Sequence, residues 1–266
     1  VDELREQCKK FVIENTDHNI YDDYNQIRKL KQNVLTEENI KAFEEKYFTD
    51  LKFSLRSHQK NARTEITNHV GRLFHLIVSP TGTGKSIMFS LAILDRISKL
   101  ITGHKPTKDY LIIAKYIAIS KQIVVNLSRN INRLYQNNIC TVNLSNIDII
   151  DCTNDISISK LNMTSNNSQI YVVNIDKFTS SNIKNKLNEI NFDKFEMMII
   201  DESHWCDAEN IYNFMLHIKN NTKIDVLGFS ATPMICLSQN ITRTQKLFSD
   251  NNDTINVLFE YSYYDA

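Results

Sequence analysis

Six short runs of apolar, β-prone residues, separated by helical stretches, limit what this chain can fold into. The runs cover residues 73–78, 110–114, 139–144, 170–174, 197–201 and 224–229. Most of them are continuously apolar rather than alternating, which is typical of strands that are covered on both faces. Strands that alternate with helices predict a parallel α/β sheet. The helix that follows Lys85 is apolar on nearly every side, so we expect it to be buried against this sheet.

Length and composition favour one large or two small folded domains of an intracellular protein. The 266 residues are 42% hydrophobic and balance 31 basic against 31 acidic side chains, so a core can form without metals or disulfides. No apolar run approaches the roughly 18 residues of a membrane span, and we expect no membrane partner. The five cysteines form no C-x-x-C pair, which indicates reduced thiols. Nucleus, cytoplasm, virus factory and virion are not distinguished.

The first fifty residues show helical spacing and no strand signal. Leu4, Cys8 and Phe11 recur at three- and four-residue steps, and Thr36 is a candidate N-cap for a later helix. We therefore predict a helical N-terminal extension over residues 1–50, with a protein partner that the sequence does not identify. Because the chain starts at Val1 rather than at methionine, we expect it to be a fragment.

Residues 79–86, Ser-Pro-Thr-Gly-Thr-Gly-Lys-Ser, have the context of a phosphate-binding loop, since an apolar strand precedes them and the buried helix follows. Glycine lets successive main-chain N–H groups point at a phosphate, and the helix N-terminus adds its dipole. The residues expected to hold the nucleotide are Thr81, Gly82, Thr83, Gly84, Lys85 and Ser86. Lys85 would reach the β- and γ-phosphates, and Ser86 would hold Mg²⁺. Ser79 replaces the first glycine of the general motif.

A second motif, Asp201-Glu202-Ser203-His204, follows the apolar strand predicted at 197–201. The carboxyl ends of parallel strands share one edge of a sheet, so these carboxylates are predicted to lie beside the phosphate loop. Asp201 can bind Mg²⁺, a hard ion that keeps several waters, and Glu202 can polarise a water for attack on the γ-phosphate. Taken alone, His204 is equally consistent with a structural and a coupling role.

A third motif, Ser230-Ala231-Thr232-Pro233, follows the last strand and would by itself be an ordinary loop. The order of the three motifs resembles the N-terminal RecA-like domain of superfamily-two (DEAD/DEAH-like) helicases and translocases. Within this superfamily, the motifs most resemble those of restriction-enzyme-type and large-DNA-virus helicases. The resemblance implies a RecA-like fold, ATP and Mg²⁺ as cofactors and DNA or RNA as partner. It also assigns His204, Ser230 and Thr232 to coupling between the nucleotide and the nucleic acid.

Three further segments fit the same scheme, and the resemblance covers about residues 54–266. Residues 55–59 resemble the adenine-recognition element, in which Gln59 would read the base and Arg56 would support it. Residues 112–122 resemble motif Ia, with Lys115 and Gln122 as candidate nucleic-acid contacts. Residues 172–178 resemble motif Ib, with Asn174 in the equivalent role.

The resemblance also divides the chain. It implies a RecA-like domain over residues 51–257, and residues 258–266 would begin a linker to a second RecA-like domain. In this family the second domain carries an arginine finger, a group worth about 10³–10⁵ in turnover in related enzymes. We therefore expect residues 1–266 to bind Mg·ATP, to hydrolyse it poorly and not to unwind.

Two other functions remain open at this point. A P-loop kinase acting on a small molecule would show acceptor-dependent ATP turnover. A nucleic-acid-binding scaffold with a decayed ATPase would bind Mg·ATP no differently after Lys85→Ala.

Overall fold

The structure is a computed structural model that describes residues 53–69, 74–154, 156–180, 186–231, 242–249 and 255–262. The predicted helical extension over residues 1–50 lies outside these ranges, as do Leu73 and Thr232. None of the helices in the described part of the chain combines the length and the apolar character needed to cross a bilayer.

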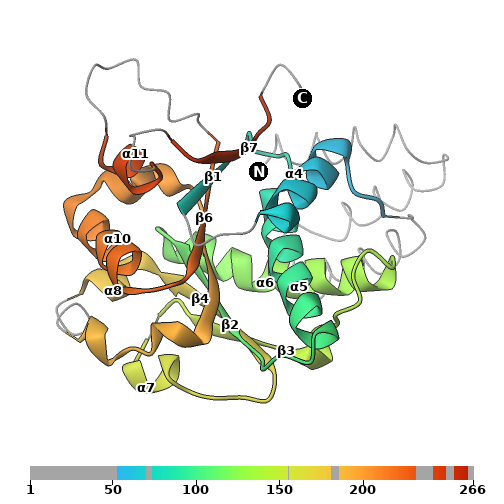
Figure 1. Ribbon diagram of the computed structural model, residues 1–266, viewed down its shortest axis with the longest axis horizontal. Coiled ribbons are helices and arrows are strands. Elements are labelled where there is room, and N and C mark those ends of the chain that lie inside the picture. Colours follow the sequence, from blue (N-terminus) through green and yellow to red (C-terminus); the bar gives the residue numbers. More distant parts are fainter. Residues whose placement is uncertain are drawn as a thin grey trace, which may run out of the picture. The chain divides into compact units, whose positions relative to one another are not determined.

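The described residues contain seven strands in a single sheet, ordered β3-β4-β2-β5-β6-β1-β7 (Figure 1). They are β1 (Phe74–Val78), β2 (Asp109–Ala114), β3 (Ile147–Cys152), β4 (Ser168–Asn174), β5 (Phe195–Ile200), β6 (Asp225–Ser230) and β7 (Val257–Glu260). Every neighbouring pair runs parallel. The parallel α/β sheet predicted from the apolar runs is therefore confirmed.

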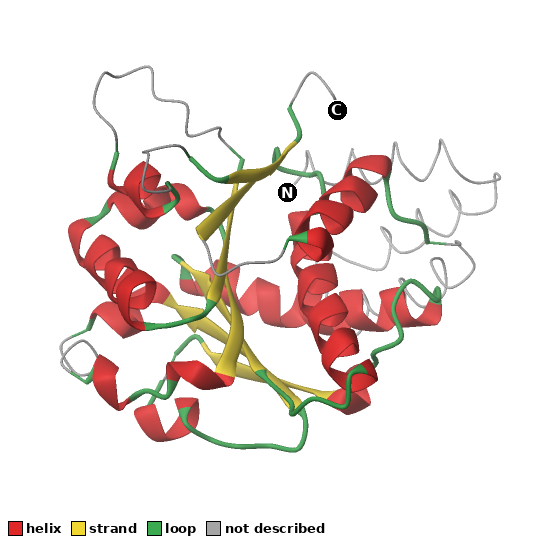
Figure 2. Ribbon diagram, viewed as in Figure 1, coloured by secondary structure: helices red, strands yellow, loops and turns green. Residues whose placement is uncertain are grey.

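Helices cover both faces of the sheet (Figure 2). The longer ones are α4 (Ser57–Asn68), α5 (Lys85–Thr102), α6 (Ile117–Gln136) and α10 (Glu209–Asn221). Shorter α-helices are α7 (Ile158–Leu161), α8 (Ile175–Thr179) and α11 (Arg243–Leu247). Single 3₁₀ turns are η1 (Leu144–Asn146), η2 (Leu187–Glu189), η3 (Phe192–Lys194) and η4 (Ser203–Asp207). Helices α4, α5 and α6 pack on one face, and α8, α10 and α11 pack on the other.

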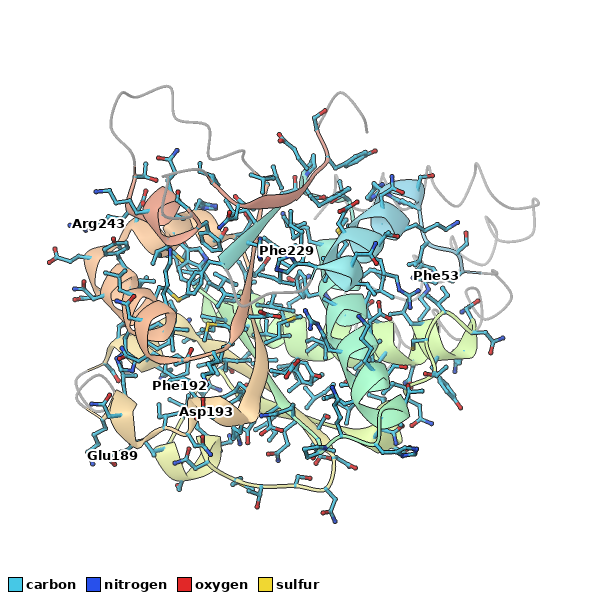
Figure 3. All side chains as sticks on the ribbon, in the orientation of Figure 1. Phe53, Glu189, Phe192, Asp193, Phe229 and Arg243 are labelled. Atoms are coloured by element: carbon cyan, nitrogen blue, oxygen red, sulfur yellow. The ribbon has the colours of Figure 1, made fainter. Side chains whose placement is uncertain are left out.

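Alternate residues of each central strand enter the two cores, which explains why the strands are apolar throughout. In β2, Tyr110 and Ile112 face the core under α5, whereas Leu111 and Ile113 face the core under α10. Phe229 of β6 points toward α5 (Figure 3), where it meets Phe89 edge to face with ring centroids 5.0 Å apart.

Helix α5 is buried as predicted, since it packs against the sheet and also contacts α4 and α6. An ion pair fixes α4 on it: Arg63 Nη2 lies 2.6 Å from Asp95 Oδ1, and Arg63 Nε donates to Asp95 Oδ2 at 2.8 Å. Thr67 of α4 donates to the same carboxylate at 3.3 Å. This packing brings the start of α4 against the phosphate loop.

The strand predicted at 139–144 is wrong. Those residues form an irregular connection that follows Asn138, whose φ is 56°, and leads into η1, and the edge strand β3 begins only at Ile147. An edge strand is covered less completely than its neighbours, so its sequence, Ile-Asp-Ile-Ile-Asp-Cys, contains aspartates and does not form a continuous apolar run. At the opposite edge, β7 pairs with β1 as far as Glu260, and Tyr261 N–H donates to Val78 O at 2.9 Å.

Candidate nucleotide-binding site

The phosphate loop joins β1 to α5 at the carboxyl edge of the sheet. Gly82 and Gly84 have φ of 82° and 86°, left-handed values that favour glycine. Ser79 is completely buried, and its hydroxyl lies 2.6 Å from the Thr83 hydroxyl. The Thr83 hydroxyl in turn donates to Pro80 O at 2.7 Å. Ser79, at the position where the general motif has glycine, therefore stabilises the loop through its contact with Thr83.

Lys85 and Glu202 meet across the edge of the sheet. Lys85 Nζ lies 2.8 Å from Glu202 Oε1 and 3.4 Å from Ser79 O. The other carboxylate oxygen, Glu202 Oε2, accepts the Ala231 N–H at 3.3 Å. Glu202 itself has a left-handed backbone, φ 53°, at the turn after β5. The structure thus brings together side chains that are 117 residues apart in sequence.

Asp201 lies beside this pair, directly after β5. Its N–H donates to Ile113 O at 2.9 Å, and Trp205 Nε1 donates to its carbonyl oxygen at 2.6 Å. Burial of the carboxyl, with a smaller contribution from the charge of Glu202, raises the pKa of Asp201 to about 6. A cation bound beside Asp201 would favour the ionised form of its carboxyl group. Ser86 stands in the first turn of α5, directly after Lys85. A carboxylate and a hydroxyl are oxygen donors of the kind that Mg²⁺ prefers.

A cavity of about 820 Å³ lies beside the loop. It is lined by Arg56, Ser57, His58, Asn61, Pro80, Thr81, Gly82, Thr83, Phe259, Glu260 and Tyr261. His58 and Tyr261 stack with ring centroids 4.3 Å apart and an interplanar angle of 16°. The cavity is large enough for a nucleoside, and residues 259–261 provide one wall.

Arg56 and Gln59, the two predicted base-recognition residues, differ in their positions. Arg56 is exposed and lines the cavity. Gln59 is buried behind the loop: its Nε2 donates to Thr83 O at 3.0 Å and its Oε1 accepts the Arg56 N–H at 3.1 Å. A Cβ added to Gly84 would lie 2.5 Å from Gln59 Nε2, so this contact requires glycine at position 84.

Two of the predicted nucleic-acid residues, Lys115 and Asn174, lie at the same edge of the sheet, at the ends of β2 and β4. Asn174 is buried and donates to Lys115 O at 2.6 Å, so its amide ties the two strand ends together. Lys115 Nζ lies 5.6 Å from the centroid of the Tyr116 ring, which is 59% exposed. Gln122 is exposed on α6. The sequence did not single out Tyr116 for a role of its own.

Of the three predicted coupling residues, the structure describes His204 and Ser230. His204 Nδ1 lies 3.6 Å from Glu202 Oε2, and the imidazole is 54% exposed. Ser230 is buried at the end of β6, next to Ala231, whose N–H contacts Glu202. Thr232 lies outside the described residues.

The fold is RecA-like, and the three motifs resemble those of superfamily-two helicases. Residues 52–235 match the family model described as the type III restriction enzyme, res subunit. The chain belongs to this family.

Two solved structures show the same fold at low sequence identity. The helicase domain of Hef from Pyrococcus furiosus is 15% identical, with a TM-score of 0.53. A nuclease-deletion mutant of the type ISP restriction-modification enzyme LlaGI, solved with a DNA substrate mimic, is 15% identical, with a TM-score of 0.52. The matches cover 78% and 79% of this chain but only 38% and 20% of those proteins. A comparison with curated protein sequences gave no match.

Proposed function

We propose that the chain is the first motor domain of an ATP-dependent nucleic-acid helicase or translocase, and that it binds Mg·ATP at the carboxyl edge of the sheet. The contact between Lys85 and Glu202, beside Asp201 and the phosphate loop, is the observation that supports this most directly. A lysine, a carboxylate for the metal and a second carboxylate for water are the groups that phosphoryl transfer to water needs.

Each of these side chains has a proposed role. Lys85 would leave Glu202 to contact the β- and γ-phosphates, and Ser86 and Asp201 would hold Mg²⁺, which would neutralise charge on the phosphates. Glu202, once released from Lys85, accepts a proton from the attacking water. Because Glu202 Oε2 also contacts Ala231 N and faces His204, a change at the carboxylate reaches the turn after β6. We propose that His204, Ser230 and Thr232 couple nucleotide state to nucleic acid through this turn.

We also propose that residues 1–266 alone hydrolyse ATP slowly. The family resemblance assigns the arginine finger to a second RecA-like domain, and without such a finger turnover in related enzymes falls by about 10³–10⁵. Of the proposed polymer contacts, Lys115 directly follows β2, on the edge that also carries the nucleotide site, and Gln122 is exposed on α6. DNA or RNA would be the polymer, and the N-terminal extension would bind a protein.

ATP turnover of a parent protein, meaning a longer form that includes the second RecA-like domain implied by the resemblance, tests this proposal when measured with and without single- and double-stranded DNA and RNA. The expected result is stimulation by one polymer that Lys85→Ala abolishes. This result would identify the nucleic acid on which the protein acts. Good turnover that responds to no polymer would favour the small-molecule kinase or a protein-directed ATPase. Undetectable turnover, with Mg·ATP binding unaffected by Lys85→Ala, would favour the scaffold.

A further inference from the structure

An aromatic side chain stands exposed at the edge of the sheet where the polymer is proposed to bind. Tyr116, two residues after the end of β2, is 59% exposed, and the next two residues, Ile117 and Ala118 at the start of α6, are exposed as well. No hydrogen bond to the Tyr116 hydroxyl group is found among the described residues, and Lys115 Nζ lies 5.6 Å from the ring centroid. Isolated exposed apolar side chains are common, so the role of Tyr116 depends on what surrounds it.

The main chain that carries this ring is fixed on both sides. Asn174, buried at the end of β4, donates from its amide to Lys115 O at 2.6 Å. The Tyr116 carbonyl accepts from the N–H and from the hydroxyl group of Ser120, at 2.9 and 3.1 Å, and Ser120 is completely buried. The ring is therefore held out from a defined backbone. A ligand that covers a group held in this way has little main-chain freedom to remove, which favours binding.

The charges beside Tyr116 favour an anionic partner. Lys115 precedes it, and Lys121, which is exposed on α6, lies one helical turn after Ile117. The first turn of α6 contains no acidic residue. An aromatic ring between lysines offers a face for a nucleobase and cations for the neighbouring phosphates. This combination is typical of sites that bind single-stranded nucleic acid.

Resting on the proposed function, we infer that Tyr116 stacks on an unpaired base of the bound polymer, so that this edge of the sheet takes a single strand of DNA or RNA. Lys115 holds the phosphate next to the stacked base, because its ammonium group already lies beside the ring. In a duplex the bases stack on one another, so the face that Tyr116 needs is covered. Every base has such a face, and the contact therefore gives no strong preference for sequence.

Binding of fluorescently labelled strands to the 266-residue protein, followed by anisotropy, separates the ring from the charges. The probes are oligothymidylate, oligouridylate, an abasic strand of the same length and a duplex. Tyr116→Ala is expected to weaken binding of the preferred base-bearing strand by about 5- to 150-fold, the contribution of one stacked base. Binding of the abasic strand and of the duplex should not change. Tyr116→Phe should bind like the unmutated protein, because stacking needs the ring and not the hydroxyl group.

The dependence of the affinity on salt gives a second readout. Lys115→Ala should make the slope of log K against log salt concentration shallower by about 0.7, the value for one phosphate of a single strand. Tyr116→Ala should lower the affinity without changing this slope. Tyr135→Ala is the matched control, since Tyr135 is 42% exposed on the same helix, about 28 Å along its axis from Tyr116. Its removal should change neither the affinity nor the slope.

Three results would overturn the inference: an unmutated protein that binds the abasic strand or the duplex as tightly as the base-bearing strands, a Tyr116→Ala protein that binds these strands undiminished, or a Tyr116→Ala protein whose salt slope falls as far as that of Lys115→Ala. In each of these cases the polymer still binds, so the inference fails and the proposed function stands. If the unmutated protein binds none of the probes, the proposed function itself fails and the inference falls with it.

Discussion

Glu202→Gln should bind Mg·ATP more tightly than the unmutated protein while losing turnover. Glutamine keeps the shape of the side chain but removes the charge that holds Lys85 Nζ at 2.8 Å. To contact a phosphate, Lys85 must leave this carboxylate, so the ion pair competes with the nucleotide. The negative charge of Glu202 also repels the phosphates, so its removal should raise the affinity for Mg·ATP for this reason as well.

The size of the gain follows from the burial of the pair. The Lys85 and Glu202 side chains are 11% and 26% exposed, so solvent screens their contact only in part. A hydrogen bond to a charged group contributes about 1.5–3 kcal/mol net, which corresponds to about 10- to 150-fold in Kd. Because the glutamine amide still offers an acceptor to Lys85, we expect the gain to lie near the lower end of that range.

Calorimetric titration of residues 1–266 with Mg·ATP measures the affinity, and turnover of the parent protein should fall by about 10²–10⁴, the usual contribution of a general base. Glu209→Gln is the matched control, because Glu209 is 72% exposed and its contact with Arg243 is long, at 3.7 Å. An affinity of Glu202→Gln equal to or lower than that of the unmutated protein would refute the competition between Glu202 and the nucleotide.

Three further predictions concern the stability of residues 53–266, each measured by urea unfolding. Burial, with a smaller effect of the neighbouring His69, lowers the pKa of His75 from 6.5 to about 4. The unfolded chain therefore takes up a proton first, and stability falls as the pH drops from 6.5 to 4, by about 3 kcal/mol at most. His75→Phe should abolish this slope, and a slope that survives would contradict the assignment. Gly228→Ala should cost about 1–3 kcal/mol, because the added Cβ would lie 2.6 Å from Phe248 Cζ; unchanged stability would show that the ring moves freely. Ser203→Ala should add about 1–3 kcal/mol, since the buried Ser203 hydroxyl has no partner among the described residues; a loss of stability would reveal one.

The sequence determined the sheet and the positions of its two principal motifs. Strands buried on both faces must be apolar throughout, so β1, β2, β4, β5 and β6 were recognisable from composition alone. Because the carboxyl ends of parallel strands share an edge, the loop containing Lys85 and the pair Asp201-Glu202 could be predicted to meet. The edge strand β3 was misplaced and the edge strand β7 was not among the predicted runs, because a partly exposed strand does not produce the same pattern.

The tertiary structure decided what individual polar side chains contact. Asn174, predicted to touch nucleic acid, is buried against Lys115 O, and Gln59 is engaged with the phosphate loop. Neither outcome can be read from local sequence, because each partner lies 24 to 59 residues away and a hydrogen bond depends on the direction in which both chains approach. The stacking of Tyr261 on His58 joins residues that are even farther apart in sequence. Two rings from opposite ends of the domain form one wall only because β7 pairs with β1, next to the loop that α4 covers.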